Sequence, residues 1–355
     1  MNPSVIANVV VAALLAGCGQ GASPPEDAPE PTQNARQESE SPRGPLLVYA
    51  SHDAARAASV LDAYRSETGT KFKLRSGAMP EQTAQGKNPR WLPKTDLFIA
   101  GSLAEVWAVA EADGLRPVNS GILSSNIPTA MRDAESRWVA LSMRARIIVY
   151  NSELVAKEKI AAVRDYSDLG DDSWRGSLCL ASSSVPGNQT LIAFLIKQLG
   201  VRQAEITVRK WQENLVALVF ADDRSLLDAI ASGQCPVGIL DSNVFASFRN
   251  SRPDAKVAAN WFAEKGNIAV DISGAGVSRH ATDPAGATLL LEWLTTATPN
   301  ALFATGSFDL PANSAAPVGV TVAEQVERMP EPESLSELGF LLEESAKLID
   351  RARYP

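Results

Sequence analysis

Histidine, cysteine and aromatic residues are scarce in this chain. Its 355 residues include two histidines and three cysteines, and aromatic residues make up 6%. His52 and His280 lie far apart in the sequence, so neither a Ser-His-Asp triad nor a centre built on several histidines is expected. The sequence also has no Walker-type phosphate loop, His-Glu-x-x-His motif or nucleophile elbow. We therefore expect that the chain is not an enzyme.

A basic excess is missing too. The chain has 33 Lys and Arg against 41 Asp and Glu, which gives a net charge of −8. Because nucleic-acid binding depends on a basic face, we exclude nucleic acid as a partner. No apolar run after Leu15 is long enough to span a membrane. The length exceeds what one hydrophobic core usually holds, which favours two lobes.

The N-terminus carries a sorting signal. Residues 5–15 are apolar apart from Asn8 and are too few to span a bilayer. The following Leu15-Ala16-Gly17-Cys18 resembles the lipobox of bacterial lipoproteins, in which the cysteine thiol takes the diacylglycerol. Residues 1–4 contain no Lys or Arg, which departs from the usual pattern, and a plain secretory signal or a misassigned start codon is the alternative. We predict a signal peptide over 1–18 and a lipid-anchored protein on the periplasmic side of a bacterial cell envelope.

Residues 19–45 form the next segment. They are rich in Pro, Glu, Ser and Gln and have no aromatic or large aliphatic side chain. Such a segment buries too little apolar surface to offset its ordering entropy. The sequence therefore predicts a disordered tether between a lipid anchor and a folded body.

Two cysteines follow the tether, Cys179 and Cys235, each on a short apolar run. In an oxidising compartment they suggest one disulfide, provided that the two runs are neighbours in one sheet. Two buried free thiols are the alternative, because the geometry decides.

The folded body reads as alternating strands and helices. Short apolar runs predict strands, and segments with helical periodicity lie between them, so we expect mainly parallel sheets covered on both faces. The predicted strands are 46–50, 71–75, 96–100, 177–181 and 237–240, and the predicted helices are 54–67, 102–113, 190–199, 224–232, 289–294 and 334–353. The long β-rich segment 138–151 is expected to cross into a second lobe, and 267–277 to return from it. We predict that lobe 1 comprises 46–142 and 270–355, and that lobe 2 comprises 143–269.

Several motifs together resemble one family. They are Leu47-Val48-Tyr49-Ala50-Ser51, Arg144-Ala145-Arg146-Ile147-Ile148-Val149-Tyr150-Asn151, Trp174-Arg175-Gly176-Ser177-Leu178-Cys179-Leu180 and Ile272-Ser273-Gly274-Ala275-Gly276-Val277. In this order they are similar to periplasmic ferric-ion-binding proteins of ABC importers, over nearly all of 46–354.

The resemblance implies an α/β type II periplasmic-binding-protein fold. Each lobe would be a doubly wound, mainly parallel sheet with flanking helices, and hinge strands would let the lobes close on a ligand. It also implies Fe(III) with a synergistic anion as the transported ligand, a permease and its ATPase as partners, and no resident cofactor. We expect a monomer.

The site departs from the family at the four tyrosines that clamp Fe(III) there, a hard cation that prefers anionic oxygen donors. By our alignment those positions carry Ala54, Gly187, Asn243 and Val244. Tyr49 and Tyr150 lie within strands and are expected to be structural.

Polar loops at strand ends supply the candidate ligand-binding residues, since doubly wound sheets bind ligands there. After the first strand come Ser51, His52 and Asp53, although Asp53 also suits simple helix capping and His52 an ordinary loop. The remaining candidates are Arg144, Arg146, Ser182, Ser183, Ser184, Asn188, Asp241 and Asn243.

Two of these groups suggest an anion site. The serine loop 182–184 precedes a helix expected to begin at Thr190, whose N-terminus would favour an anion, although turn chemistry alone is the alternative. Arg144 and Arg146 alternate with apolar residues and should share one face, and a buried arginine needs an anionic partner from protein or ligand. Asp222 and Asp223 are carboxylates that helix capping explains equally well.

Three functions stay open on sequence alone. The first is a ferric-iron-type binding lipoprotein of an importer. The second is a binder of a small anion or metal–anion complex, in which Arg146→Ala would weaken binding more than Tyr150→Phe. The third is a sensor or interaction protein on the same fold.

Overall fold

A computed structural model describes residues 44–79, 94–216, 219–262, 268–330 and 334–355. The predicted lipobox with Cys18 and nearly all of the predicted tether lie outside these residues. Among the described residues, no helix combines the length and apolar character that crossing a bilayer requires.

The first sheet begins with three parallel strands. β1 (Leu46–Ala50) lies between β2 (Phe72–Ser76) and β3 (Leu97–Ala100), and β3 pairs antiparallel with β8 (Val270–Val277). Asp53 caps the N-terminus of α1 (Ala54–Thr68), which ends at Gly69 in the left-handed region, and Ser102 caps α3 (Leu103–Glu111). These caps place the polar loops after β1 and β3 at the same edge of the sheet.

The second sheet has a similar plan. β5 (Leu178–Leu180) pairs parallel with β6 (Val237–Asp241), and β6 pairs antiparallel with β4 (Val139–Asn151), which also pairs with β7 (Val257–Asn260). The parallel order expected from the sequence thus holds within β2-β1-β3 and β5-β6, whereas every pair that involves β4 or β8 is antiparallel.

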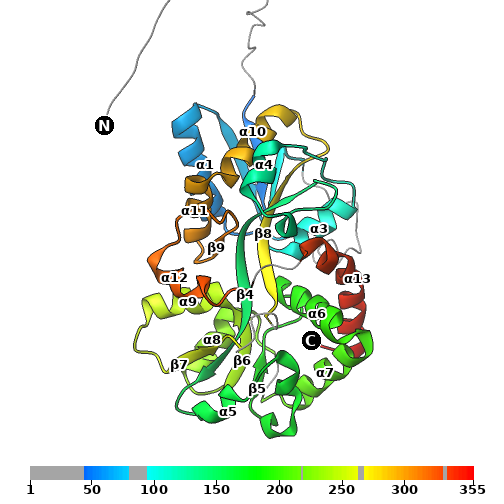
Figure 1. The fold of residues 1–355 in the computed structure, drawn as a ribbon, viewed down its shortest axis with the longest axis vertical. Helices are drawn as coiled ribbons and strands as arrows, with labels where there is room; N and C mark the ends of the chain where they lie inside the picture. The colour runs from blue at the N-terminus through cyan, green and yellow to red at the C-terminus, as the bar shows by residue number, and fades with distance from the viewer. Residues whose placement is uncertain (1–43, 80–93, 217–218, 263–267, 331–333) are drawn as a thin grey trace, which may run out of the picture. The chain divides into compact units, whose positions relative to one another are not determined.

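β4 connects the two sheets. Its first half pairs with β8 and with β9 (Leu310–Pro311), and from Arg146 onward it pairs with β6. Figure 1 shows β4 and β8 running side by side between an upper and a lower lobe. The predicted crossing at 138–151 is therefore present, and the change of partner lies close to the predicted lobe boundary at 142/143, although the boundaries themselves stay a prediction.

Helices cover both lobes (Figure 1). Those of the first lobe, besides α1 and α3, are α4 (Gly121–Asn126), α10 (Pro284–Thr295) and α11 (Ala297–Thr305). Those of the second are α5 (Lys157–Ala161), α6 (Pro186–Leu199), α7 (Val201–Glu213), α8 (Asp223–Ala231) and α9 (Ser242–Ser251). After the short α12 (Ala323–Val326), α13 (Leu335–Ala352) closes the chain. Single-turn 3₁₀ helices are η1 (Thr129–Met131), η2 (Tyr166–Gly170), η3 (Asp172–Trp174) and η5 (Val320–Val322).

α13 contacts both lobes. Ser345 Oγ donates to the Gln189 carbonyl of α6 in the second lobe. In the first lobe Ser336 Oγ accepts from the Ala134 amide, and Phe340 packs edge-on against Trp107 of α3 with ring centroids 4.9 Å apart. The helix therefore joins the lobes independently of β4 and β8.

Cys179 and Cys235 form a disulfide, with their Cα atoms 6.1 Å apart. Cys179 lies in β5 and Cys235 shortly before β6, the parallel neighbour of β5. Since the two cysteine-bearing runs are neighbours in one sheet, the disulfide prediction is confirmed and the free-thiol alternative is wrong.

Candidate functional site

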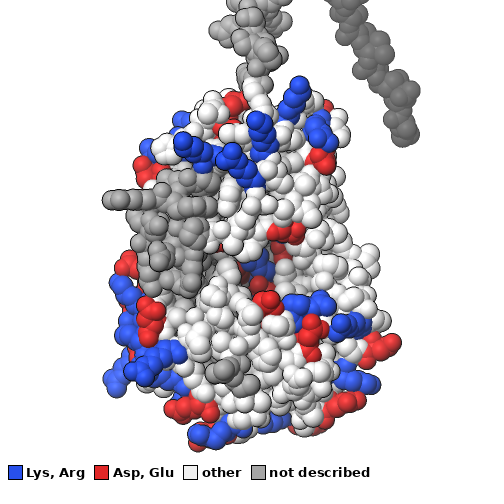
Figure 2. All heavy atoms as spheres, turned by 180° about the vertical axis from the view of Figure 1, so that it is seen from behind, with Lys and Arg blue, Asp and Glu red and all other residues white. Residues whose placement is uncertain are grey.

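The crossing strands lie at the floor of a hollow between the lobes. Figure 2 shows this hollow at mid-height, with basic and acidic atoms together at its base. Arg144 and Arg146 of β4 both contact the Asp241 carboxylate, so the alternation does place them on one face. Arg146 also pairs directly with Asp241 in the β4–β6 ladder.

Arg144 joins three segments of the chain. Its Nε donates to Asp241 Oδ2 at 3.1 Å, and its Nη2 donates to Asp271 Oδ2 and to the Gly101 carbonyl, both at 2.7 Å. Asp241 belongs to β6 of the second lobe, whereas Gly101 follows β3 of the first. This buried guanidinium therefore bridges the lobes at their junction.

Arg146 is fully buried and contacts protein groups. Nη1 donates to Asp223 Oδ2 at 2.5 Å and to Asp241 Oδ1 at 3.0 Å, and Nη2 donates to Asn188 Oδ1 at 2.6 Å. A Cβ atom on Gly187 would lie 3.1 Å from both Arg146 Nη1 and Asp241 Oδ1. The absence of a side chain at Gly187 lets α6 pack tightly against the pair. Protein carboxylates therefore supply the anionic partner that Arg146 needs.

A third buried arginine, which the sequence analysis did not single out, comes from α1. Arg56 Nη1 lies 3.2 Å from Asp309 Oδ2 and its Nη2 donates to Ser273 Oγ. The guanidinium also covers the ring of Phe303 at 4.3 Å. Only the helical periodicity of α1 could have indicated that Arg56 faces inward.

Acidic groups outnumber the arginines here. Among the described residues, Arg56, Arg144 and Arg146 form ion pairs with four buried carboxylates, those of Asp223, Asp241, Asp271 and Asp309. Burial would raise the pKa of Asp241, but Arg146 and Arg144 outweigh it and lower that pKa. For Asp223 and Asp271 burial wins and raises the pKa. The arginines are thus compensated, and the floor is not a positively charged surface.

His52 is the most accessible of the polar groups after β1. Its Nδ1 lies 3.3 Å from Glu105 Oε1, its side chain is 44% exposed, and none of the described residues hydrogen-bonds Nε2. The hydrogen bond to Glu105 raises the pKa of His52 against the opposing effect of burial. Ser51 is 2% exposed and donates to Glu105 Oε2 at 2.7 Å. Ser51 and Glu105 therefore orient the histidine ring, a common arrangement behind histidine ligands.

Asp53 and the glycine beside His52 have structural roles. Asp53 accepts from the Arg56 amide at 3.0 Å, so the capping explanation is confirmed. A Cβ atom on Gly101 would lie 2.5 Å from His52 Nδ1. Only glycine at this position leaves room for the ring.

The serine loop differs from the expectation. α6 begins at Pro186, four residues before Thr190, and the amides of Ser182, Ser183 and Ser184 donate to Phe220 O, Pro355 O and Ser182 Oγ respectively. All three loop amides are therefore engaged within the protein. Two of these amides bind carbonyls of Phe220 and Pro355, residues distant in the sequence, so the local sequence could not show that the loop amides are occupied.

The two candidate asparagines lie in different surroundings. Asn188 is 2% exposed, accepts from Arg146 and donates to the Ala181 and Ser182 carbonyls. Asn243 lies at the start of α9, and its buried Oδ1 has no hydrogen-bond partner among the described residues. Asn188 thus acts as a structural bridge.

All five tyrosines of the chain fall within the described residues. The hydroxyls of Tyr49, Tyr166 and Tyr354 donate to the carbonyls of Gly77, Arg146 and Ala181. Tyr64 packs against Trp293 in the first lobe, and Tyr150 lies in β4 beyond the lobe junction. Burial raises the pKa of Tyr166 and of Tyr354. The tyrosines are therefore spread over both lobes and do not converge on the hollow.

The described residues contain no group of three or more His, Cys, Asp or Glu side chains arranged to hold a metal ion.

Comparison with known proteins places the chain in a family. Residues 49–301 match the family model described as bacterial extracellular solute-binding protein. The chain therefore belongs to this family, whose members are the binding components of transporters and not enzymes.

Curated relatives cover most of the chain. It is 28% identical over 353 residues to iron uptake protein A1 of Synechocystis sp., a match that covers 97% of this chain and 94% of the relative. It is 23% identical over 214 residues to the major ferric iron-binding protein of Neisseria meningitidis, covering 58% and 61%.

Solved structures show the same architecture. A Trichodesmium protein in complex with iron and citrate superposes with a TM-score of 0.76 at 26% identity, over 88% of this chain and 100% of that one. The apo ferric-ion-binding protein A of Pasteurella haemolytica gives 0.77 at 21% identity, over 87% and 98%. The two-lobed type II periplasmic-binding fold is therefore confirmed.

Proposed function

We propose that the protein captures iron in the hollow between its lobes and delivers it to an ABC permease and its ATPase. The observation that carries the proposal is the excess of carboxylates over arginines at the floor. That excess disfavours a free anion and favours a ligand with cationic character. The iron-related names of the relatives support the same ligand class.

We further propose that iron arrives with a small organic anion that supplies part of its coordination. The positions that we align with the family's tyrosine clamp carry Ala54, Gly187, Asn243 and Val244. The hydroxyls of Tyr49, Tyr166 and Tyr354 are engaged with carbonyls. His52 Nε2, on the ring that Glu105 orients, is the leading protein donor. Asp241 is the second candidate, although both of its oxygens already contact arginines. A ferric ion needs more donors than these, so the accompanying anion supplies the remainder.

Arg144 and Arg146 take a different role in this proposal. Both are compensated by Asp223, Asp241 and Asp271 and thereby fix the Asp241 carboxylate at the floor. We propose them as positioning residues, together with Ser51 and Asn188. The hydroxyls of Ser182, Ser183 and Ser184 and the amide of Asn243 remain candidates for contact with the anion.

Localisation completes the proposal. A lipid on Cys18 and the tether over 19–45 would hold a monomeric receptor at the periplasmic side of a bacterial membrane. The lipobox motif and the extracellular character of the family support this placement.

The test compares the two histidines of the chain. Wild type, His52→Ala and His280→Ala are titrated with ferric citrate, bare ferric ion and citrate alone. Loss of a residue that only orients a metal ligand typically lowers metal affinity by about 10–100-fold. Since His52 is proposed as a ligand itself, His52→Ala should weaken the binding of ferric citrate by at least that factor. His280 is exposed beyond β8, and its replacement should change nothing.

Optical spectroscopy adds a second readout. We expect the ferric complex to show no tyrosinate-to-iron charge-transfer band. Equal ferric citrate affinity in wild type and His52→Ala, or tight binding of bare ferric ion with such a band, would show that the proposed site is wrong. Stronger binding of citrate alone than of ferric citrate would favour the anion-binder alternative.

A further inference from the structure

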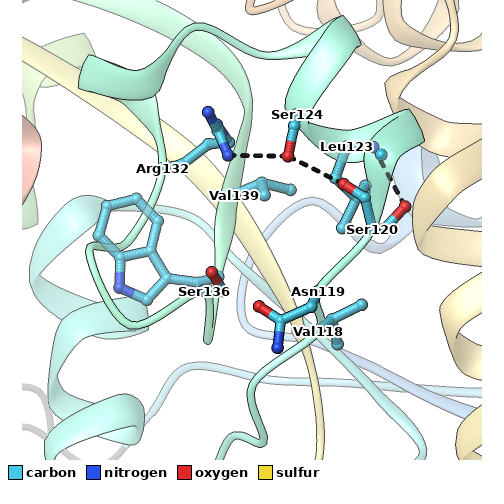
Figure 3. Close-up of a pocket in the computed structure, with 10 residues that line it drawn as sticks. Val118, Asn119, Ser120, Leu123, Ser124, Arg132, Ser136 and Val139 are labelled. Carbon is cyan, nitrogen blue, oxygen red and sulfur yellow. Dashed lines mark hydrogen bonds between the residues drawn. The ribbon is translucent and has the colours of Figure 1, made fainter.

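A second cavity lies in the first lobe, formed by the loop before α4, by α4 itself and by the loop that leads into β4. Its volume is about 340 Å³, and Figure 3 shows its wall. Cavities of a few hundred Å³ are typical of small-molecule sites. The lining residues are Val118, Asn119, Ser120, Gly121, Leu123, Ser124, Arg132, Ser136, Trp138 and Val139.

Arg132 supplies the cavity with positive charge. Its Nη1 donates to Ser124 Oγ at 3.2 Å and its Nη2 to Thr129 Oγ1 at 3.0 Å (Figure 3 shows the first of these). A guanidinium has five N–H donors, so three are left without a partner among the described residues. One of them, on Nε, is buried.

No carboxylate of the described residues lies within 4.0 Å of the Arg132 nitrogens. The nearby acids have other partners, since Asp133 binds Arg137 at 2.7 Å and Glu292 accepts from Ser120 Oγ at 2.6 Å. A half-buried cation that contacts hydroxyls alone is under-compensated. An anion in the cavity would supply the missing charge.

The rest of the wall sets the kind of anion. Ser136 and Asn119 add polar groups to the lining, whereas Val118, Leu123 and Val139 are apolar. The indole N–H of Trp138, a residue only 1% exposed, also lacks an acceptor among the described residues. Charged and apolar surface side by side suit a molecule with a charged head and a short carbon skeleton.

We propose that this cavity binds a small organic carboxylate, with the carboxylate on Arg132 and the carbon skeleton against Val118, Leu123 and Val139. The site is formed by the first lobe alone and shares no residue with the floor of the hollow. The inference therefore does not depend on iron as the transported ligand.

The experiment titrates the purified full-length chain with butyrate, and with butyramide as the uncharged analogue, followed by saturation-transfer NMR and calorimetry. Loss of a charge-assisted hydrogen bond should weaken butyrate binding by about tenfold or more in Arg132→Gln. Arg116→Gln, which removes an exposed arginine of the same lobe outside the cavity, and His52→Ala should leave the affinity unchanged. Butyramide should not bind.

Several results would overturn the proposal. They are the absence of saturable butyrate binding, equal affinity in Arg132→Gln and wild type, or loss of binding in His52→Ala, which would place the anion in the hollow instead. Sulfate that competes as well as butyrate would contradict the carboxylate class. If Arg132→Gln lowers the melting temperature, Ser124→Ala provides the second test, since it removes the Nη1 partner and should also change butyrate affinity.

Discussion

Individual arginines show how far a single residue can be predicted from sequence. The alternation of Arg144 and Arg146 with apolar neighbours predicted a shared, buried face, and this is confirmed. Which anion each one meets was not predictable. Asp241 faces Arg146 across the β4–β6 ladder, and Asp223 reaches it from α8, 77 residues away in the sequence. Strand register and helix placement fix these contacts, and neither has a local signal.

The burial of Arg146 predicts a large effect on stability. Arg146→Ala removes the arginine partner of the buried Asp223 and leaves Asp241 with Arg144 alone, so we expect a loss of about 3–5 kcal/mol in the free energy of unfolding. Tyr150→Phe should cost about 1 kcal/mol or less. Urea denaturation of both variants measures the difference. Equal urea midpoints for the two variants would show that the ion pairs of Arg146 contribute little to stability. We still expect weaker ligand binding in Arg146→Ala than in Tyr150→Phe, because Asp241 loses one of the two arginines that position it.

Asp96 predicts a pH-dependent contribution. Its carboxylate is 1% exposed and accepts from the Leu47 amide at 2.8 Å, the Asp283 amide at 3.1 Å and the Thr282 hydroxyl at 2.9 Å. Burial alone would raise its pKa, but these hydrogen bonds outweigh burial and lower it. A lowered pKa means that the stabilisation is complete above the unfolded-state pKa of about 3.9 and is lost as the pH falls through the folded value.

Asp96→Asn tests this. The amide group places a donor against backbone N–H groups, so the variant should be less stable than wild type at pH 7, and the gap should narrow below about pH 4. Thermal melts from neutral to acidic pH follow the gap in stability between the variant and wild type. Asp254→Asn, at an exposed position, is the control for the loss of one negative charge. A gap that is constant down to the lowest pH would contradict the role of Asp96.

At the scale of elements, periodicity located most helices and strands. The predicted strands at 46–50 and 237–240 and the helices at 54–67 and 224–232 agree with β1, β6, α1 and α8 to within a few residues. α9 was missed, because its sequence, Ser-Asn-Val-Phe-Ala-Ser-Phe-Arg-Asn-Ser, has low helix propensity and the helix depends on packing of Ala246 and Phe248. α7 was also missed, although its amphipathic pattern is clear.

The approach of α13 to α3 predicts a strict need for glycine. A Cβ atom on Gly339 would lie 2.2 Å from Trp107 Cε3. Gly339→Ala should therefore destabilise the protein by about 1–3 kcal/mol through overpacking, even though alanine favours helix. Gly319→Ala, outside any helix, is the control for adding a methyl group without overpacking, because a Cβ atom there would lie at an ordinary 3.5 Å from Thr305 Cγ2. Equal urea midpoints for the two variants would show that α13 or Trp107 can shift enough to accommodate the added methyl group.

For the whole molecule, the two-lobed fold could be predicted because the family motifs occur in order along the chain. The site could be predicted only in outline. The loops after β1 and β3 do meet, but sequence gave no indication that Glu105 orients His52 or that Arg56 enters the charged floor. Long-range contacts between lobes decide which polar groups stay accessible, and such contacts have no counterpart in local patterning.

The lipobox predicts where the whole molecule resides. Cys18→Ala removes the thiol that takes the lipid, so the precursor should remain unprocessed and unlabelled by a fatty-acid analogue. The wild-type chain should incorporate the label and fractionate with membranes. Equal labelling of the two proteins would refute the lipoprotein assignment and support a plain secretory signal.

The attachment of α13 to both lobes has a mechanical consequence. If β4 and β8 were the sole connection, the lobes could rotate about these two strands in either direction. α13 adds a second connection away from these strands, because Ser336 and Phe340 contact the first lobe and Ser345 contacts the second. It therefore opposes any rotation that would pull these contacts apart. We therefore expect the mouth to widen on the flank away from α13, so that cargo enters and leaves from one side and the membrane partner meets a receptor with a fixed front.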